Sequence, residues 1–143
     1  MLRCLRLISL LLILLSSHFA AFSQGNAVVY PDSVDQRVRY EIVIEMPKAY
    51  LSGLMIMHKS EEGRVDASVI NEFGISLMDL SYDEKKDKIK IHSITDKLNK
   101  WYIKRTLSND FKSILKAMQD GLNEYLNSKR KIKYSFQLAN ETE

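Results

Sequence analysis

Hydrophobic and polar side chains alternate most clearly along residues 37–46, RVRYEIVIEM. Every second side chain there, from Val38 through Tyr40 to Met46, is apolar, and β-branched and aromatic residues are frequent. A period of two with this composition is typical of a half-buried β-strand. Pro47 cannot donate a ladder hydrogen bond, so we expect the strand to end before it.

Four more segments have the composition of strands and are separated by short polar turns: residues 51–58, 64–73, 75–82 and 88–92. A parallel crossover needs about a dozen residues or more, and none of these turns is that long. The five strands are therefore predicted to form an antiparallel meander whose apolar, concave face must be covered by other elements.

The hydrophobic period lengthens after residue 93, to spacings of three and four residues that are typical of one face of a helix. A short helix is predicted from four apolar side chains at these spacings: Ile94, Leu98, Trp101 and Tyr102. We expect Trp101 to anchor this helix on the sheet.

A second, longer helix is predicted from an apolar stripe, with Ser108 as its N-cap and Asp110 in its first turn. The stripe consists of Leu107, Phe111, Ile114, Leu115, Met118, Leu122, Tyr125 and Leu126. Gly121 would lie inside this helix, at a cost of about 1 kcal/mol relative to alanine. Residues 132–138 alternate again and predict one late strand after the helices.

The N-terminus has the three parts of a secretory signal. Arg3 and Arg6 precede an apolar run, residues 7–15, and small residues follow it. The run is shorter than the roughly 20 residues that a membrane-spanning helix needs. We expect residues 1–23 to be a signal peptide cleaved after Ser23, with Ala21 as a second cleavage position and an uncleaved membrane anchor as the alternative.

Cleavage would produce a periplasmic or secreted protein that is soluble and not lipid-anchored. Cys4 is the only cysteine, and it precedes the apolar run, whereas a lipoprotein signal has its cysteine just after that run. Residues 24–36 would form a lead-in segment, residues 37–138 a single domain and residues 139–143 a loose tail.

Cleavage would also change the charge balance. The 21 basic residues of the whole chain would fall to 19 with the loss of Arg3 and Arg6, against 18 acidic ones, for a net charge of +1. Proteins that bind nucleic acid usually have a clustered basic surface, so a near-neutral chain does not indicate this partner.

Candidate catalytic and metal-ligating residues are sparse. His58 and His92 lie near strand ends without the spacing of a metal site, and no G-x-S-x-G motif marks a nucleophile. Asp79 interrupts the apolar face of its strand, and we expect it to face solvent, with a polar group inside a pocket as the alternative. We expect no enzymatic activity, no metal and no cofactor.

Lysines gather in residues 85–90 and 129–133, where they are expected to form solvated strand faces and to protect exposed sheet edges. The alternative is a weak attraction to anionic lipid head groups, which would make peripheral membrane contact. Lys100, Lys104 and Arg105, beside Trp101 and Tyr102, would make an interfacial belt on this alternative.

Four methionines fall among the aliphatic residues of the predicted core: Met55, Met57, Met78 and Met118. Methionine fills irregular gaps in cores, but methionine-rich surfaces also adapt to ligands of variable shape, such as acyl chains. We expect filler, with a partly open apolar face as the alternative.

The run LSGLMIMHKSEEGRVDASVINEFGISLMDLSYDEKKDKIKIHSI, followed by ITDKLNKWYIKRTLSNDFKSILKAM, resembles the periplasmic lipoprotein carriers and outer-membrane lipoprotein acceptors (LolA/LolB-like). It has a strand with a central glycine, Gly53, a strand ending at Gly74, a hydrophobic strand, a hairpin and then helices. The resemblance covers about residues 37–118. It implies an α+β fold with a curved antiparallel sheet, an open half-barrel, covered by two helices over an apolar cavity for acyl chains.

Two functions are therefore considered. The first is a small exported protein of the bacterial envelope that binds a lipid, an acyl chain or an acylated protein, with a role in lipoprotein or outer-membrane assembly. The binding site for its ligand would be lined by Val38, Tyr40, Ile42, Leu54, Ile56, Leu77, Met78, Phe111, Leu115 and Met118. The second is a non-enzymatic interaction module with a filled core, whose open sheet edge pairs with another chain or with a second copy in a homodimer.

Overall fold

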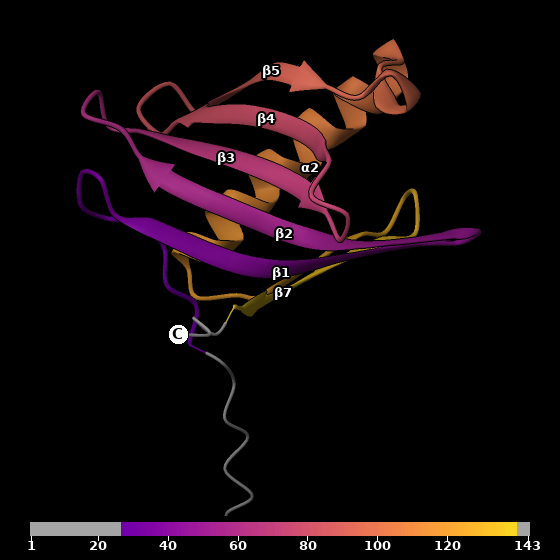
Figure 1. Cartoon of the computed structure of the whole chain (residues 1–143), viewed down its shortest axis with the longest axis horizontal. Helices are drawn as coiled ribbons and strands as arrows, with labels where there is room; N and C mark the ends of the chain where they lie inside the picture. Colours follow the sequence, from indigo (N-terminus) through magenta and orange to yellow (C-terminus); the bar gives the residue numbers. More distant parts are fainter. Residues whose placement is uncertain (1–26, 140–143) are drawn as a thin grey trace, which may run out of the picture.

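The structure is a computed structural model that describes residues 27–139. Within them one curled antiparallel sheet of seven strands, a half-barrel, wraps around a single α-helix, α2 (Figure 1). The strands are β1 (Arg37–Met46), β2 (Ala49–Lys59), β3 (Arg64–Asn71), β4 (Ser76–Asp83), β5 (Lys88–Ile94), β6 (Glu124–Asn127) and β7 (Ile132–Leu138). A 3-10 turn, η1 (Asp96–Leu98), precedes α2 (Trp101–Gln119).

The sheet order is β5-β4-β3-β2-β1-β7-β6. The predicted five-strand meander is confirmed, and β7 returns to pair with the free side of β1. β1 is thus a central strand, which agrees with its long and regular alternation. Its apolar side chains face the core, where Tyr40 and Ile42 are almost completely buried.

The helix α2 lies across the concave face of the sheet, and its backbone comes closest to the two edge strands, β5 and β6. This arrangement requires the sheet to curl around the helix, as Figure 1 shows. The helix buries Phe111, Ile114, Leu115 and Met118 against the sheet. The predicted α+β class and curved antiparallel sheet are confirmed.

The prediction of two helices is wrong. Ile94 ends β5, Leu98 belongs to η1, and Trp101 begins α2, so the helical spacing of these residues joins three different elements. The helix that starts at Trp101 then continues without a break through Ser108 and Asp110. Ser108 is therefore not an N-cap, and Asp110 lies in the middle of the helix.

The end of the second predicted helix is also wrong. Gly121 adopts a positive φ of 81°, and its N–H donates to the Met118 carbonyl while the Leu122 N–H donates to the Ala117 carbonyl. These two bonds form a Schellman motif, which ends a helix and favours glycine at this position. Leu122, Tyr125 and Leu126 consequently lie beyond the helix, and two late strands, β6 and β7, follow it instead of one.

The segment before β1 is tied to the sheet. The Tyr40 hydroxyl accepts a hydrogen bond from the Val29 N–H (2.7 Å) and donates one to the Val29 carbonyl (2.6 Å). The Ala139 N–H donates to the Arg39 carbonyl just after β7. The predicted signal peptide, residues 1–23, and residues 140–143 of the predicted tail lie outside the described residues. Between residues 27 and 139, no helix is both long enough and apolar enough to span a membrane.

Candidate functional site

The ten residues predicted to line a ligand do not all share one face. Seven of them lie in the core between α2 and the sheet, each at most 6 % exposed: Val38, Tyr40, Ile42, Met78, Phe111, Leu115 and Met118. Leu54 and Ile56 pair with Glu41 and Arg39 of β1 and point to the outer, convex face. Leu77 is half-buried where the pairing of β3 and β4 shifts register.

The concave face is filled along its middle. Phe111 and Tyr134 pack edge to face with ring centroids 6.1 Å apart, and Met55, Met57 and Met118 are at most 1 % exposed. The methionines therefore serve as core filler, because their flexible side chains complete the contact between helix and sheet.

An apolar pocket of about 200 Å³ remains at one end of this core. It opens between the first two turns of α2 and the ends of β1, β2 and β7. Its lining is almost entirely apolar: Ile44, Met46, Leu51, Leu98, Tyr102, Ile103, Thr106, Leu107, Arg130, Ile132 and Tyr134. None of the ten residues predicted from the sequence lines it.

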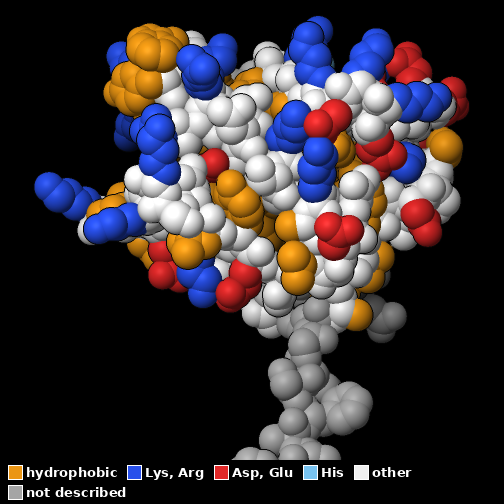
Figure 2. All heavy atoms as spheres, turned by 180° about the vertical axis from the view of Figure 1, so that it is seen from behind, with side chains coloured by type: hydrophobic (Ala, Val, Ile, Leu, Met, Phe, Trp, Pro, Cys, Tyr) orange, Lys and Arg blue, Asp and Glu red, His pale blue; other side chains and the backbone are white. Residues whose placement is uncertain are grey.

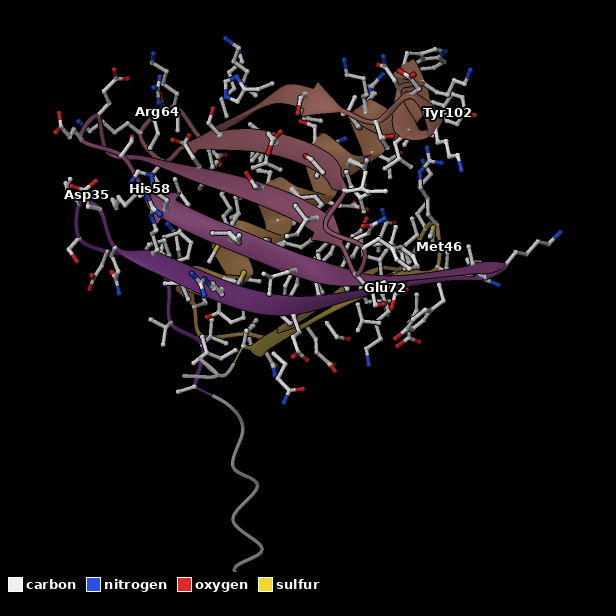
Figure 3. The ribbon with its side chains drawn as sticks, viewed as in Figure 1. Asp35, Met46, His58, Arg64, Glu72 and Tyr102 are labelled. Atoms are coloured by element: carbon white, nitrogen blue, oxygen red, sulfur yellow. The ribbon has the colours of Figure 1, made fainter. Side chains whose placement is uncertain are left out.

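Strand direction brings these residues together. Because neighbouring strands are antiparallel, the turns after β1, β3 and β6 and the connection from β5 to α2 all lie at the same end of the sheet. We call this the pocket end and define it by residues 47–50, 72–75, 95–106 and 128–131, together with Met46. Figure 3 shows Met46, Glu72 and Tyr102 at the pocket end and Asp35, His58 and Arg64 at the other.

A polar cleft of about 400 Å³ adjoins the apolar pocket and shares Tyr102, Thr106 and Arg130 with it. The cations Arg105 and Lys129 also line this cleft. The two sites therefore place apolar and basic groups side by side.

Asp110 lines the same cleft, although its side chain is only 2 % exposed. One carboxylate oxygen accepts a hydrogen bond from the Asn127 amide and the other from the Tyr134 hydroxyl, each at 2.7 Å. Burial, followed by this contact with Asp110, raises the pKa of the Tyr134 hydroxyl. Asp110 thus joins α2 to β6 and β7 and holds the walls of both sites in place.

Trp101 does not anchor a helix on the sheet, as the sequence predicted. It is 76 % exposed, and its ring packs edge to face against Tyr102, which is 48 % exposed, at a centroid distance of 5.9 Å. The residue lies at the first position of α2, outside the stripe that faces the core. The docking of the helix depends instead on Phe111 and the residues that follow it on the same stripe.

The outer face of β4 and β5 holds a polar cluster. Ser81 Oγ lies 2.8 Å from Nε2 of His92, while the Asp79 carboxylate accepts hydrogen bonds from Ser93 and Ser76. These bonds, with that of Ser93 the largest cause, lower the pKa of Asp79. A Ser-His-Asp triad requires the carboxylate to orient the histidine. Here, among residues 27–139, Asp79 bonds to serines and His92 bonds only to Ser81.

His58, the other histidine of the described residues, lies 3.2 Å from the Asp35 carboxylate at the end away from the pocket. Across those residues no group of three metal-ligating side chains comes together. Neither histidine contributes to the pocket or to the adjoining cleft.

The two sheet edges are protected. β6 has only four residues, and β5 has exposed Lys88 and Lys90 along it. Short strands and edge lysines are common means of preventing pairing with another chain. Both edges therefore offer a poor template for strand addition, and pairing through an open edge stays a prediction.

Sequence reasoning missed the pocket because it placed the ligand under the middle of the helix. Ile44, Leu107 and Ile132 each belong to a pattern in the sequence, but that pattern predicts only burial in the core. Their shared signal is position: every one lies near an element end that an antiparallel meander brings to the same side of the sheet. Ile103 carried no signal, because the predicted break between helices left it in a loop.

The chain was compared with protein-family models, with curated proteins and with solved structures. No family model, no curated protein and no solved structure matches it significantly, so the pocket end is interpreted from its own geometry.

Proposed function

We propose that this chain is an exported protein of the bacterial envelope that binds an apolar ligand at the pocket end. The observation that carries the proposal is the open pocket with an almost entirely apolar lining. Water gains few hydrogen bonds in such a space, and apolar cavities of this kind take up apolar molecules. The predicted secretory signal supports the location, and the resemblance to LolA/LolB-like proteins supports a role in lipoprotein or outer-membrane assembly.

The size of the pocket limits the ligand. Its volume of about 200 Å³ exceeds that of an engineered cavity of about 150 Å³ that binds benzene. It is below the range of about 300–1,000 Å³ that is typical of sites for whole drug-sized ligands. We therefore assign to it one acyl segment or a comparable apolar group, with the rest of the ligand outside.

The test is the uptake of octanoate and dodecanoate by the full chain, followed by isothermal calorimetry and thermal unfolding. A ligand that binds only the folded state at about 100 times its Kd adds about 2.7 kcal/mol of stability. This gain would raise the Tm by roughly 10 °C for a domain of this size. Native mass spectrometry and lipid extraction of the purified protein would show any ligand that it already carries.

Two variants locate the binding. Ile103→Trp places a large ring in the pocket and should weaken fatty-acid binding at least tenfold. Leu126→Trp adds the same ring at an exposed position of β6 outside the pocket lining and should leave binding unchanged. An empty protein whose Tm does not respond to either fatty acid would rule the proposal out, and so would equal binding by both variants.

A further inference from the structure

Positive charge is concentrated at the pocket end. Its segments contain two acidic residues, Glu72 and Asp96, against eight basic ones: Lys48, Lys97, Lys100, Lys104, Arg105, Lys129, Arg130 and Lys131. The resulting charge of +6 exceeds the net charge of +3 of the whole chain, so the rest of the molecule is negative overall. The protein therefore has a pronounced charge asymmetry from end to end, which its net charge conceals.

The basic side chains of the pocket end differ from those elsewhere in their pairing. Within residues 27–139, none of the eight forms an ion pair. Away from this end, basic side chains do form ion pairs: Lys59 pairs with Glu84, and Lys112 and Lys116 both pair with Asp87. Seven of the eight basic side chains at the pocket end are also exposed, and Lys104 is half-buried. Their charge is thus available to an external anion.

Large apolar side chains are exposed at the same end. Six of the ten exposed large hydrophobic residues of the described chain lie there: Met46 (36 %), Tyr50 (67 %), Phe73 (81 %), Ile75 (59 %), Trp101 (76 %) and Tyr102 (48 %). Figure 2, in which α2 begins at the upper left, shows hydrophobic and basic side chains gathered there side by side. Exposed apolar side chains that gather in one area are typical of interaction surfaces.

We propose that the pocket end docks on the surface of a lipid bilayer that contains anionic lipids. Lysines and arginines near such a surface are attracted by its negative potential. Trp and Tyr prefer the level of the head groups, where the ring is in an apolar environment and its polar atom is hydrated. The long lysine side chains reach the head groups while the rings enter between them.

The combination of groups favours a bilayer over other polyanions. A nucleic-acid backbone would satisfy the cations but would leave the aliphatic Met46 and Ile75 without a partner. An interface with an acidic protein would need a complementary solid surface, whereas the turns of the pocket end project to different extents (Figure 1). Lipid head groups are mobile and can adapt to such an uneven protein surface.

The first test measures binding to phosphatidylcholine vesicles with and without phosphatidylglycerol. The protein is expressed from the full chain in cells that export it, so that the predicted signal peptide can be removed. We expect sedimentation with the anionic vesicles and little with the neutral ones. Because the Debye length falls severalfold between about 0.05 M and about 0.5 M salt, binding should weaken strongly over that range. Trp101 is the single tryptophan of the sequence, so its fluorescence reports on this surface alone. Its emission should shift to shorter wavelength when anionic vesicles are added.

The second test reverses charge at two ends of the molecule. One variant combines Lys97→Glu, Lys100→Glu and Arg105→Glu at the pocket end. Its matched control makes the same change in net charge elsewhere, at Lys85, Lys88 and Lys90, which are exposed and form no ion pair in the described chain. Each basic residue near an anionic surface contributes enough that losing three should weaken partition by roughly 100-fold or more. The control should bind like the parent chain.

Several results would overturn the proposal. Equal binding to neutral and anionic vesicles would show that charge does not direct docking, and equal losses in both triple variants would show that the pocket end has no special role. No sedimentation at low salt, or an unchanged Trp101 emission, would leave an acidic protein as the partner of this surface. If the pocket-end variant fails to fold, the salt dependence and the Trp101 emission of the parent chain still decide the question.

Docking in this orientation would bring the opening of the apolar pocket to the bilayer. That consequence, unlike docking itself, rests on the proposed function. The two can be separated, because Ile103→Trp should weaken fatty-acid uptake at least tenfold while vesicle binding persists. The charge-reversal variant should lose vesicle binding and retain uptake of octanoate from solution.

Discussion

At the residue scale, Gly53 allows β2 and β3 to approach each other. A Cβ built on Gly53 would lie 2.1 Å from the Ile70 carbonyl oxygen, which is too close for any side chain to fit. This approach occurs where Ile70 begins the register shift between β3 and β4. The glycine that supported the family resemblance therefore has a local steric role in this fold.

We predict that Gly53→Ala lowers the free energy of unfolding by about 1–3 kcal/mol, the usual cost of overpacking, because backbone must move. Gly63 provides the contrast, since it has open space around it but a φ of 75°. Asparagine tolerates that conformation. Gly63→Asn should therefore unfold at nearly the urea concentration of the parent chain, whereas Gly53→Asn should be at least as damaging as Gly53→Ala. Equal midpoints for Gly53→Asn and Gly63→Asn would contradict this explanation.

Asp110 is a second residue whose role depends on its partners. Asp110→Ala leaves the buried Tyr134 hydroxyl and the Asn127 amide without their acceptor, at a cost of about 1–3 kcal/mol for each group that remains unsatisfied. In a double-mutant cycle, Tyr134→Phe should make the loss of Asp110 less costly, because only Asn127 is then left unpaired. Urea unfolding of the four proteins measures this coupling. Strictly additive losses would show that the bond of Tyr134 to Asp110 contributes nothing.

At the element scale, one carboxylate connects the β4–β5 turn to α2. Asp87 accepts hydrogen bonds from Lys112 and Lys116, each at 2.9 Å, and from the Tyr82 hydroxyl at 3.0 Å. These bonds, with that of Lys112 first, hold the pKa of Asp87 well below its usual range. A lowered pKa in the folded state stabilises the fold above the unfolded pKa, and this stabilisation is lost as the pH falls.

We therefore predict that Asp87→Asn lowers the Tm at neutral pH. The difference from the parent chain should shrink as the pH falls below about 4, the pKa of an unfolded aspartate. Because the side chain is partly exposed, solvent screening limits the effect, and high salt should reduce it further. Asp32→Asn, at an exposed carboxylate without an ion pair in the described chain, should leave the Tm unchanged. A difference that stays constant from neutral to acid pH would contradict the prediction.

Elements were predicted with uneven success, for a physical reason. Hydrophobic and polar side chains alternate over many residues of each strand, so a strand can be recognised even where single positions break the pattern. The helix boundaries depend on single residues: Gly121 ends α2 through its positive φ, and Trp101 begins it without facing the core. Periodicity alone cannot distinguish a glycine inside a helix from one that caps it, because the sequence neighbours are the same in both cases.

At the scale of the whole molecule, buried tyrosines limit the alkaline stability of the fold. Burial, followed by the hydrogen bond to Asp87, raises the pKa of Tyr82 to about 12. Burial also raises the pKa values of Tyr40 and Tyr134. Since these folded-state values lie above the unfolded value of about 10, the stabilisation is complete below pH 10 and is lost as the pH rises toward 12.

The expected outcome is a Tm that holds up to about pH 10 and falls steeply between about pH 10 and pH 12, with ionisation of the buried tyrosines, followed at 295 nm, appearing together with unfolding. Tyr82→Phe should have a lower Tm at neutral pH and a shallower decline above pH 10. Tyr50, which is 67 % exposed, offers the control, and Tyr50→Phe should leave the profile unchanged. Full tyrosine ionisation before any loss of folded structure would contradict the prediction.

The charge asymmetry is also a property of the whole molecule. A mature chain of net charge +1, as the sequence predicts, gives no sign of it. It arises because the fold brings turns from four parts of the chain to one end, and this end carries most of the cations that form no ion pair within residues 27–139. The lysines of residues 129–131, expected to be a solvated face, join those of residues 97–105 only in the folded structure.

The antiparallel sheet, its five consecutive strands, the strand at residues 132–138 and most of the core could be predicted without the structure, because each follows from periodicity within a segment. Burial of Val38, Tyr40, Ile42 and Phe111 needed no knowledge of the rest of the chain. That α2 fills the middle of the concave face and leaves a pocket at one end follows only from the folded arrangement. The position of Trp101, outside the core and beside unpaired lysines of the described residues, could likewise not be predicted, since helix position and strand direction depend on contacts between residues far apart in the chain.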